Sequence, residues 1–104
     1  MTVYNKLVRD GIPALIRTQG EIPHTRILEQ EEYTACLEAK LDEEVMEYHK
    51  ERNLEELADI LEVVYALAEN MGHTRLDLES VYDRKHETRG GFRERFFLIS
   101  KEDA

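Results

Sequence analysis

The stretch LDEEVMEYHKERNLEELADILEVV, residues 41 to 64, decides the fold because two helical patterns meet in it, at Asn53. The first pattern predicts a long helix from about residue 30 to residue 52. Its inward side carries apolar residues at helical spacing: Tyr33, Leu37, Leu41, Val45 and Tyr48. The second helix starts at Leu54. Because the break is so short, the two helices are expected to be antiparallel neighbours.

The second helix is apolar around most of its circumference from Leu54 to Ala68. One neighbouring helix cannot cover so wide an apolar surface. We therefore expect an all-α fold in which the antiparallel pair joins a second copy, so that a four-helix bundle forms the core on oligomerisation.

The rest of the chain predicts shorter elements within a single domain, residues 1–104. Pro13 favours a short helix that runs to about Gln19 and is closed by Gly20. Residues 22–28 read as a short extended segment or an edge strand. Thr74 and Asp77 form an N-cap pair for a helix over residues 75–89. Residues 92–99 are apolar enough that we expect them to pack back onto the domain as a second extended segment.

The composition of the chain excludes some classes of function. The formal charge is −9, and residues 29–62 hold 13 acidic and only 3 basic side chains. This charge argues against binding duplex nucleic acid, since phosphate contacts need a basic face. The single Cys36 reads as a small buried hydrophobe, which fits a reducing cytoplasm. No apolar run resembles a signal peptide or reaches the ~20 residues of a membrane span, so a soluble cytoplasmic protein is expected.

Two acidic motifs flank the break at Asn53. Residues three apart lie on one side of a helix. This spacing places Glu44 and Glu47 of the first motif on one side of their helix, and Glu56 and Asp59 of the second motif on one side of theirs. Glu43 precedes Glu44 in the first motif. Glu44 falls inside the apolar stripe, where a carboxylate needs a cation as partner, unless that end of the stripe reaches solvent.

The second motif has its own alternatives. Glu56 is three residues after Asn53, so helix capping is an alternative explanation for it. Asp59 lies in the helix interior and has no capping role to explain it.

These acids predict the metal-binding half of a site that acts on phosphate esters. Magnesium is typically held by carboxylates together with water and substrate phosphates. The other half should be groups that bind phosphate directly. The candidates are Lys6, Arg9, Arg84, Lys85 and Arg89, with the backbone N–H groups of Gly90 and Gly91. Lys6 and Arg9 have an alternative explanation as ordinary solvated residues. The basic residues of the 75–89 helix have another, because positive charge near a helix C-terminus interacts favourably with the helix dipole.

The order of these motifs resembles the all-α nucleoside triphosphate pyrophosphohydrolases, a superfamily that includes MazG, the all-α dUTPases and phosphoribosyl-ATP pyrophosphohydrolase. The opening YNKLVRDGIP, the stretch EELADILEVVYAL and the close RKHETRGGF resemble its small MazG-like, phosphoribosyl-ATP-pyrophosphohydrolase-like branch over nearly the whole chain. Gly11 departs from this pattern, because a basic residue is expected there.

The resemblance implies Mg²⁺-dependent hydrolysis, with Mn²⁺ as a substitute, between the α- and β-phosphates of a nucleotide, releasing pyrophosphate and a monophosphate. It implies a homodimer or homotetramer. It makes four acids the metal ligands: Glu44, Glu47, Glu56 and Asp59. Glu43 becomes a further ligand or a residue that orients the attacking water, so Glu43 and Glu44 are the expected catalytic residues.

The leading expectation is therefore an enzyme that clears non-standard or surplus nucleotides and needs neither duplex nucleic acid nor a membrane. The alternative is a non-catalytic helical assembly or regulatory module with solvated acidic faces. A di-iron carboxylate bundle fits less well, because that chemistry uses paired Glu-x-x-His motifs on helices. Here Glu21 and His24 lie in the extended segment, while Asp83 takes the place of Glu before His86.

Overall fold

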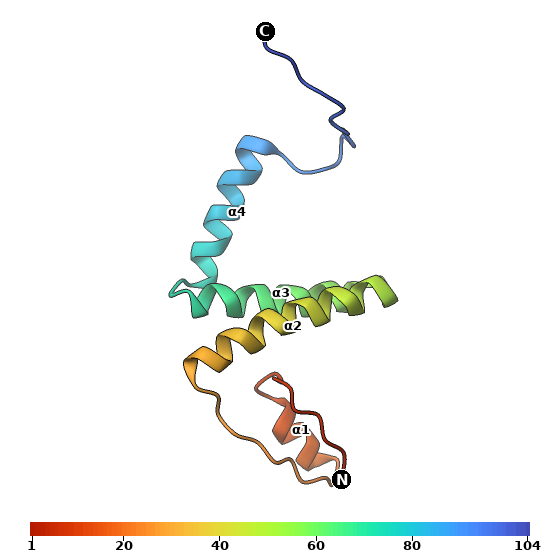
Figure 1. The fold of residues 1–104 in the computed structure, drawn as a ribbon, viewed down its shortest axis with the longest axis vertical. Coiled ribbons are helices and arrows are strands. Elements are labelled where there is room, and N and C mark those ends of the chain that lie inside the picture. Colours follow the sequence, from red (N-terminus) through yellow and green to blue (C-terminus); the bar gives the residue numbers. More distant parts are fainter.

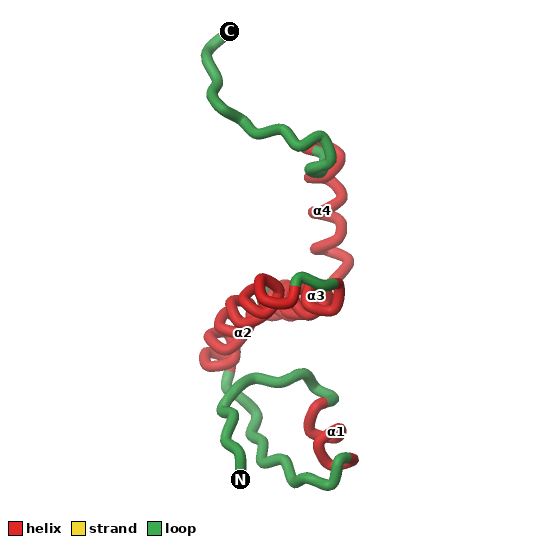
Figure 2. The backbone as a smooth tube through the Cα atoms, turned by 90° about the vertical axis from the view of Figure 1, so that its right-hand side faces the viewer, coloured by secondary structure: helices red, strands yellow, loops and turns green.

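The computed structural model describes residues 1 to 104, and its regular secondary structure consists of helices joined and flanked by loops, with no strand (Figure 2). It contains four helices, α1 (Ile12–Thr18), α2 (Gln30–Glu51), α3 (Leu54–Asn70) and α4 (Arg75–Arg89). Helices α2 and α3 lie side by side and antiparallel, while α1 lies apart from this pair, below it in the view of Figure 1, and α4 projects from the end of α3. The all-α prediction is confirmed. No helix has both the length and the apolar character needed to cross a membrane.

The connection between α2 and α3 is a tight turn made by two residues. Arg52 ends α2 in the left-handed conformation, with φ 49° and ψ 53°, and its N–H donates to the Tyr48 carbonyl at 2.7 Å. Asn53 then caps α3, since its side-chain oxygen accepts a hydrogen bond from the Glu56 N–H at 2.9 Å. The predicted break and restart are confirmed, and they reverse the chain direction.

The other helix ends also follow local rules. Helix α1 has its Pro in the first turn, and Gly20 follows it with φ +84°. At α4 the predicted pair forms a complete capping box: the Thr74 hydroxyl accepts from the Asp77 N–H at 3.1 Å, and the Asp77 carboxylate accepts from the Thr74 N–H at 2.9 Å. These contacts lower the pKa of Asp77, chiefly through the backbone hydrogen bond of Thr74.

A single chain buries few of its residues and little of its surface. Only three of 104 residues are buried, namely Leu37, Val63 and Ala68. The chain exposes 9,898 Å², whereas a compact monomer of 12.2 kDa exposes about 6,100 Å². The radius of gyration is 18.5 Å, against about 13 Å for a compact domain of this length. The chain alone therefore lacks a core of ordinary size.

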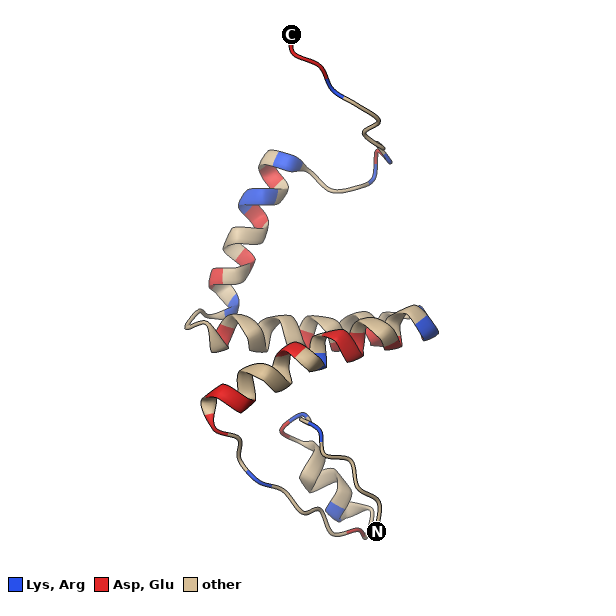
Figure 3. Ribbon diagram, viewed as in Figure 1, with Lys and Arg blue, Asp and Glu red and all other residues tan.

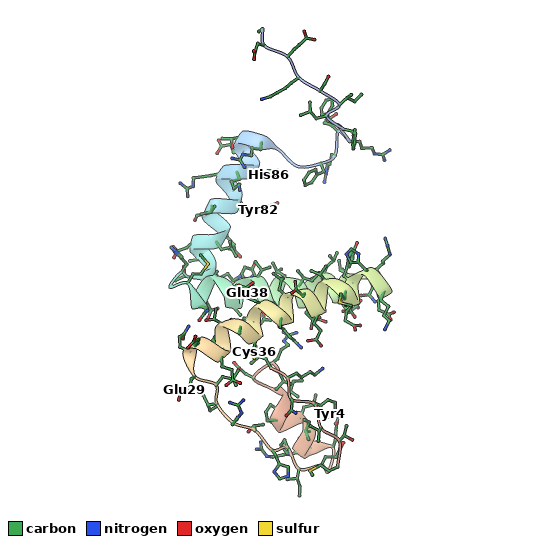
Figure 4. All side chains as sticks on the ribbon, viewed as in Figure 1. Tyr4, Glu29, Cys36, Glu38, Tyr82 and His86 are labelled. Carbon is green, nitrogen blue, oxygen red and sulfur yellow. The ribbon has the colours of Figure 1, made fainter.

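Two expectations about burial are wrong. The segment 92–99 does not pack back onto the domain, because it leaves the far end of α4 and its Phe96 and Phe97 side chains are 92% and 88% exposed (Figure 1). The adjoining residues of α4, 83–89, are all charged or polar and offer the segment no apolar surface. Cys36 is only partly buried, since it lies about 100° around α2 from the buried Leu37 (Figure 4).

Candidate functional site

The antiparallel pair brings acids of both motifs together. Carboxylate oxygens of Glu44 on α2 and of Glu56 and Asp59 on α3 lie within 4.8 Å of one another. All three side chains are partly covered. Figure 3 shows the acidic positions along both helices. Three of the four predicted metal ligands therefore converge, and we call these three residues the acidic triad.

Glu47 and Glu43 lie outside the acidic triad. Glu47, one helical turn beyond Glu44, acts on the triad through its charge, which contributes to the raised pKa of Glu56. Glu43 is held by two lysines, since its carboxylate lies 3.6 Å from Lys6 Nζ and 3.3 Å from Lys40 Nζ. Glu43 is thus next to the triad but engaged elsewhere.

The neighbouring acids affect the pKa of Glu56. Partial removal from water raises its pKa above the ordinary value, and the charges of Asp59, Glu47 and Glu44 raise it further. Capping does not account for this carboxylate, because Asn53 is bonded by the backbone N–H of Glu56 and the Glu56 side chain makes no hydrogen bond in return. Glu56 is an acid in a negative environment without a cation of its own.

Glu44 is covered, as its place in the apolar stripe predicts. Its side chain is 12% exposed, and its carboxylate lies 3.4 Å from Nζ of Lys40, which is itself 16% exposed. Lys40 is therefore the cation partner of Glu44 within the chain. Lys40 was not among the predicted site residues, although it lies three and four residues before Glu43 and Glu44, which is the spacing of helical ion pairs.

The segment before α1 places two predicted phosphate-binding residues against the acids. Arg9 Nη1 donates to Asp59 Oδ1 at 3.3 Å, and Arg9 Nη2 lies 4.0 Å from a carboxylate oxygen of Glu62. Lys6 lies against Glu43 on the neighbouring helix. Both basic side chains remain about half exposed. They form a basic rim beside the acidic triad.

The basic residues of α4 lie elsewhere. Arg84, Lys85 and Arg89 line a shallow hollow of about 200 Å³ on α4 itself. The triad sits in the first two turns of α3, and α4 starts beyond the opposite end of that helix, which is roughly 20 Å away at 1.5 Å per residue. Figure 3 shows the blue positions far out on α4. Within one chain, these residues and the following Gly90 and Gly91 are not brought to the acids.

Comparison with known proteins identifies one similar stretch. Over 42 residues the chain is 60% identical to an uncharacterized protein of Mycolicibacterium smegmatis, a match that covers 40% of this chain and 43% of that protein. The chain thus spans less than half the length of this relative. No protein-family model matches the chain. No solved structure matches it either.

Proposed function

We propose that this protein is a Mg²⁺-dependent nucleotide pyrophosphohydrolase that cleaves the α–β phosphate bond of a nucleoside triphosphate or a related nucleotide. The observation that carries the proposal is the acidic triad, in which one carboxylate of α2 and two of α3 lie within 4.8 Å of one another. The resemblance of the flanking motifs to the MazG-like branch supports the same reaction class.

The donor set fits a hard divalent cation. Three carboxylates supply only oxygen, the ligand type that Mg²⁺ and Mn²⁺ prefer. Glu44, Glu56 and Asp59 would hold the ion, with Glu47 one turn away as a fourth donor. When bound, such an ion neutralises phosphate charge and lowers the pKa of a ligated water. The raised pKa of Glu56 supports this assignment, because positive charge at this point would relieve the repulsion.

The basic rim would supply the phosphate contacts. A guanidinium binds two phosphate oxygens at once, and the Arg9 side chain is 59% exposed beside Asp59. Lys6 offers a point charge next to Glu43. Glu43 stands at the edge of the triad, where a carboxylate can orient or deprotonate an attacking water.

We also propose that a second copy covers the outer face of α3 and completes a four-helix core in a homodimer or homotetramer. Leu54, Leu57 and Leu61 are exposed on α3, and the chain exposes far more surface than a compact monomer does. Lys85 and Arg89 would then act as phosphate contacts only if the α4 of another copy carried them to the triad. Light scattering at micromolar concentration tests the assembly, and a monomer would contradict it.

A non-catalytic assembly module is the second candidate, and a specific observation favours it. Lys40 already pairs with Glu44 and Arg9 with Asp59, so two of the three acids have structural partners within the chain. Such a role would require neither metal nor turnover.

The deciding experiment is pyrophosphate release from a panel of nucleoside triphosphates and phosphoribosyl-ATP, with Mg²⁺ and with chelator. We expect Mg²⁺-dependent release that Asp59→Asn abolishes and the matched charge change Glu38→Gln, on the exposed side of α2, leaves intact. Absence of release from every substrate would favour the assembly module.

A further inference from the structure

The segment 92–99, FRERFFLI, is an exposed apolar chain with two free arginines. A turn closed by the Arg95 N–H and the Phe92 carbonyl at 3.1 Å precedes four consecutive apolar residues. Phe96, Phe97, Leu98 and Ile99 are each at least 77% exposed. In an extended chain alternate side chains point to opposite faces, so this run presents apolar groups on both faces. Such a segment needs a surface on each side.

A groove between α3 and α4 offers one such surface. Its volume is about 450 Å³. Five apolar side chains line it, Leu61, Val64 and Tyr65 from α3 and Leu78 and Tyr82 from α4. Leu61 also belongs to the exposed face of α3, so the groove continues the surface on which a second copy would pack.

The charges of the segment and the groove are complementary. Glu79 and Asp83 stand at the groove, and Asp83 forms no ion pair within the chain, whereas Glu79 is bound by Arg75 at 2.8 Å. Arg93 and Arg95 in the segment likewise form no ion pair within the chain, and with Glu94 between them the segment has a net charge of +1. An arginine beside Asp83 would give both groups a partner.

We propose that the segment 92–99 of one copy lies in the α3–α4 groove of a second copy. The segment continues beyond the end of α4 that is farther from α3 (Figure 1), and a second copy would offer a surface to each of its two apolar faces. The area is sufficient. Three phenylalanines alone bring roughly 450–750 Å² per chain, so a reciprocal exchange approaches the roughly 1,200–2,000 Å² of stable interfaces.

Cross-linking of the full chain in a Cys36→Ser background distinguishes exchange from folding back. One chain carries Tyr82→Cys and a size tag, the other carries Phe97→Cys, and a short bis-maleimide joins thiols that lie close together. We expect a cross-linked heterodimer in the mixture and none when Ile27→Cys, an equally exposed apolar position, replaces Phe97→Cys. Cross-linking only within a single chain that carries both cysteines would overturn the proposal, as would no cross-link in either arrangement.

Sedimentation provides an independent measurement. Phe96→Ser with Phe97→Ser should weaken association at least about a hundredfold, because two large apolar side chains lose their burial. Ile27→Ser should change association by less than about threefold. Circular dichroism of each variant verifies that the helices persist, which is expected because all three positions are exposed. Unchanged association of the double variant would refute the exchange and leave the proposed hydrolase activity unaffected.

Discussion

Replacing Glu44 by glutamine separates the two explanations of the acidic triad, metal binding and structural pairing. The amide keeps the shape of the carboxylate and removes one of three negative charges that lie within 4.8 Å of one another. It also removes the charge that Lys40 faces at 3.4 Å. Lys40 keeps Glu43 at 3.3 Å, so the substitution leaves no lysine unpaired.

The electrostatic gain and loss nearly cancel without metal. At an effective dielectric of about 20, unit charges 3.4 Å apart attract by about 5 kcal/mol. Like charges 4.8 Å apart repel by about 3.5 kcal/mol under the same conditions. The Asp59 side chain is 38% exposed, which lowers its repulsion toward about 1 kcal/mol, and repulsion from Glu56 adds to it. We therefore expect the free energy of unfolding of Glu44→Gln in chelator to lie within about 1 kcal/mol of that of the wild type.

Magnesium should then distinguish the two proteins. An ion at a concentration of about 100 times its dissociation constant stabilises the wild type by about 2.7 kcal/mol, which is about 10–20 °C in Tm for a domain of this size. If the lost charge weakens binding about tenfold, the gain falls to about 1.4 kcal/mol or less.

The assay is a set of thermal melts at fixed protein concentration, with chelator and with increasing Mg²⁺. Glu38→Gln is the matched control, because it makes the same change at an exposed position of the same helix (Figure 4). A full Mg²⁺ response in Glu44→Gln would refute the metal assignment. An equal loss in Glu38→Gln would refute it as well, since general charge would then explain the response.

Three further predictions concern separate features. The pKa of Glu56 is raised in the folded state, so its contribution to stability is complete at a pH below its unfolded-state pKa and is lost as the pH rises through its folded-state pKa. Glu56→Gln should therefore raise Tm in chelator at a pH above the folded-state pKa, and Tm should depend less on pH in melts from pH 4 to 7. Thr74→Ala should cost about 0.5–2 kcal/mol in denaturant unfolding by removing the α4 cap, whereas Thr74→Ser should cost little. Lys85→Ala and Arg89→Ala should each lower kcat/KM for the substrate that the panel identifies; unchanged values in both would leave the helix dipole as the explanation of these residues.

The helix ends and the pairing of α2 with α3 were predictable because their causes are local. Asn53 and Thr74 each bond a backbone N–H three residues ahead, and such contacts depend on a few neighbouring residues. The convergence of Glu44 with Asp59 follows from the same turn. The ion pair of Lys40 with Glu44 was also predictable from the sequence, because the two residues are four positions apart on one helix.

Contacts between distant parts of the chain were not predictable in the same way. Arg9 meets Asp59 across 50 positions, and no local pattern encodes that pair. The position of the segment 92–99 depends on which apolar surfaces lie within its reach. The segment was expected to pack on an apolar surface of its own domain, but the adjoining residues 83–89 of α4 are charged or polar.

The turn at Arg52 and Asn53 also has a consequence for folding kinetics. Glu44 and Asp59 are only 15 positions apart, so closing the α2–α3 hairpin costs little chain entropy and should occur early. The repulsion of the acidic triad is then present in the transition state, where it slows folding more than it speeds unfolding. Mg²⁺ should accordingly accelerate refolding in stopped-flow measurements. An effect confined to the unfolding rate would instead show that the acids meet only after the rate-limiting step.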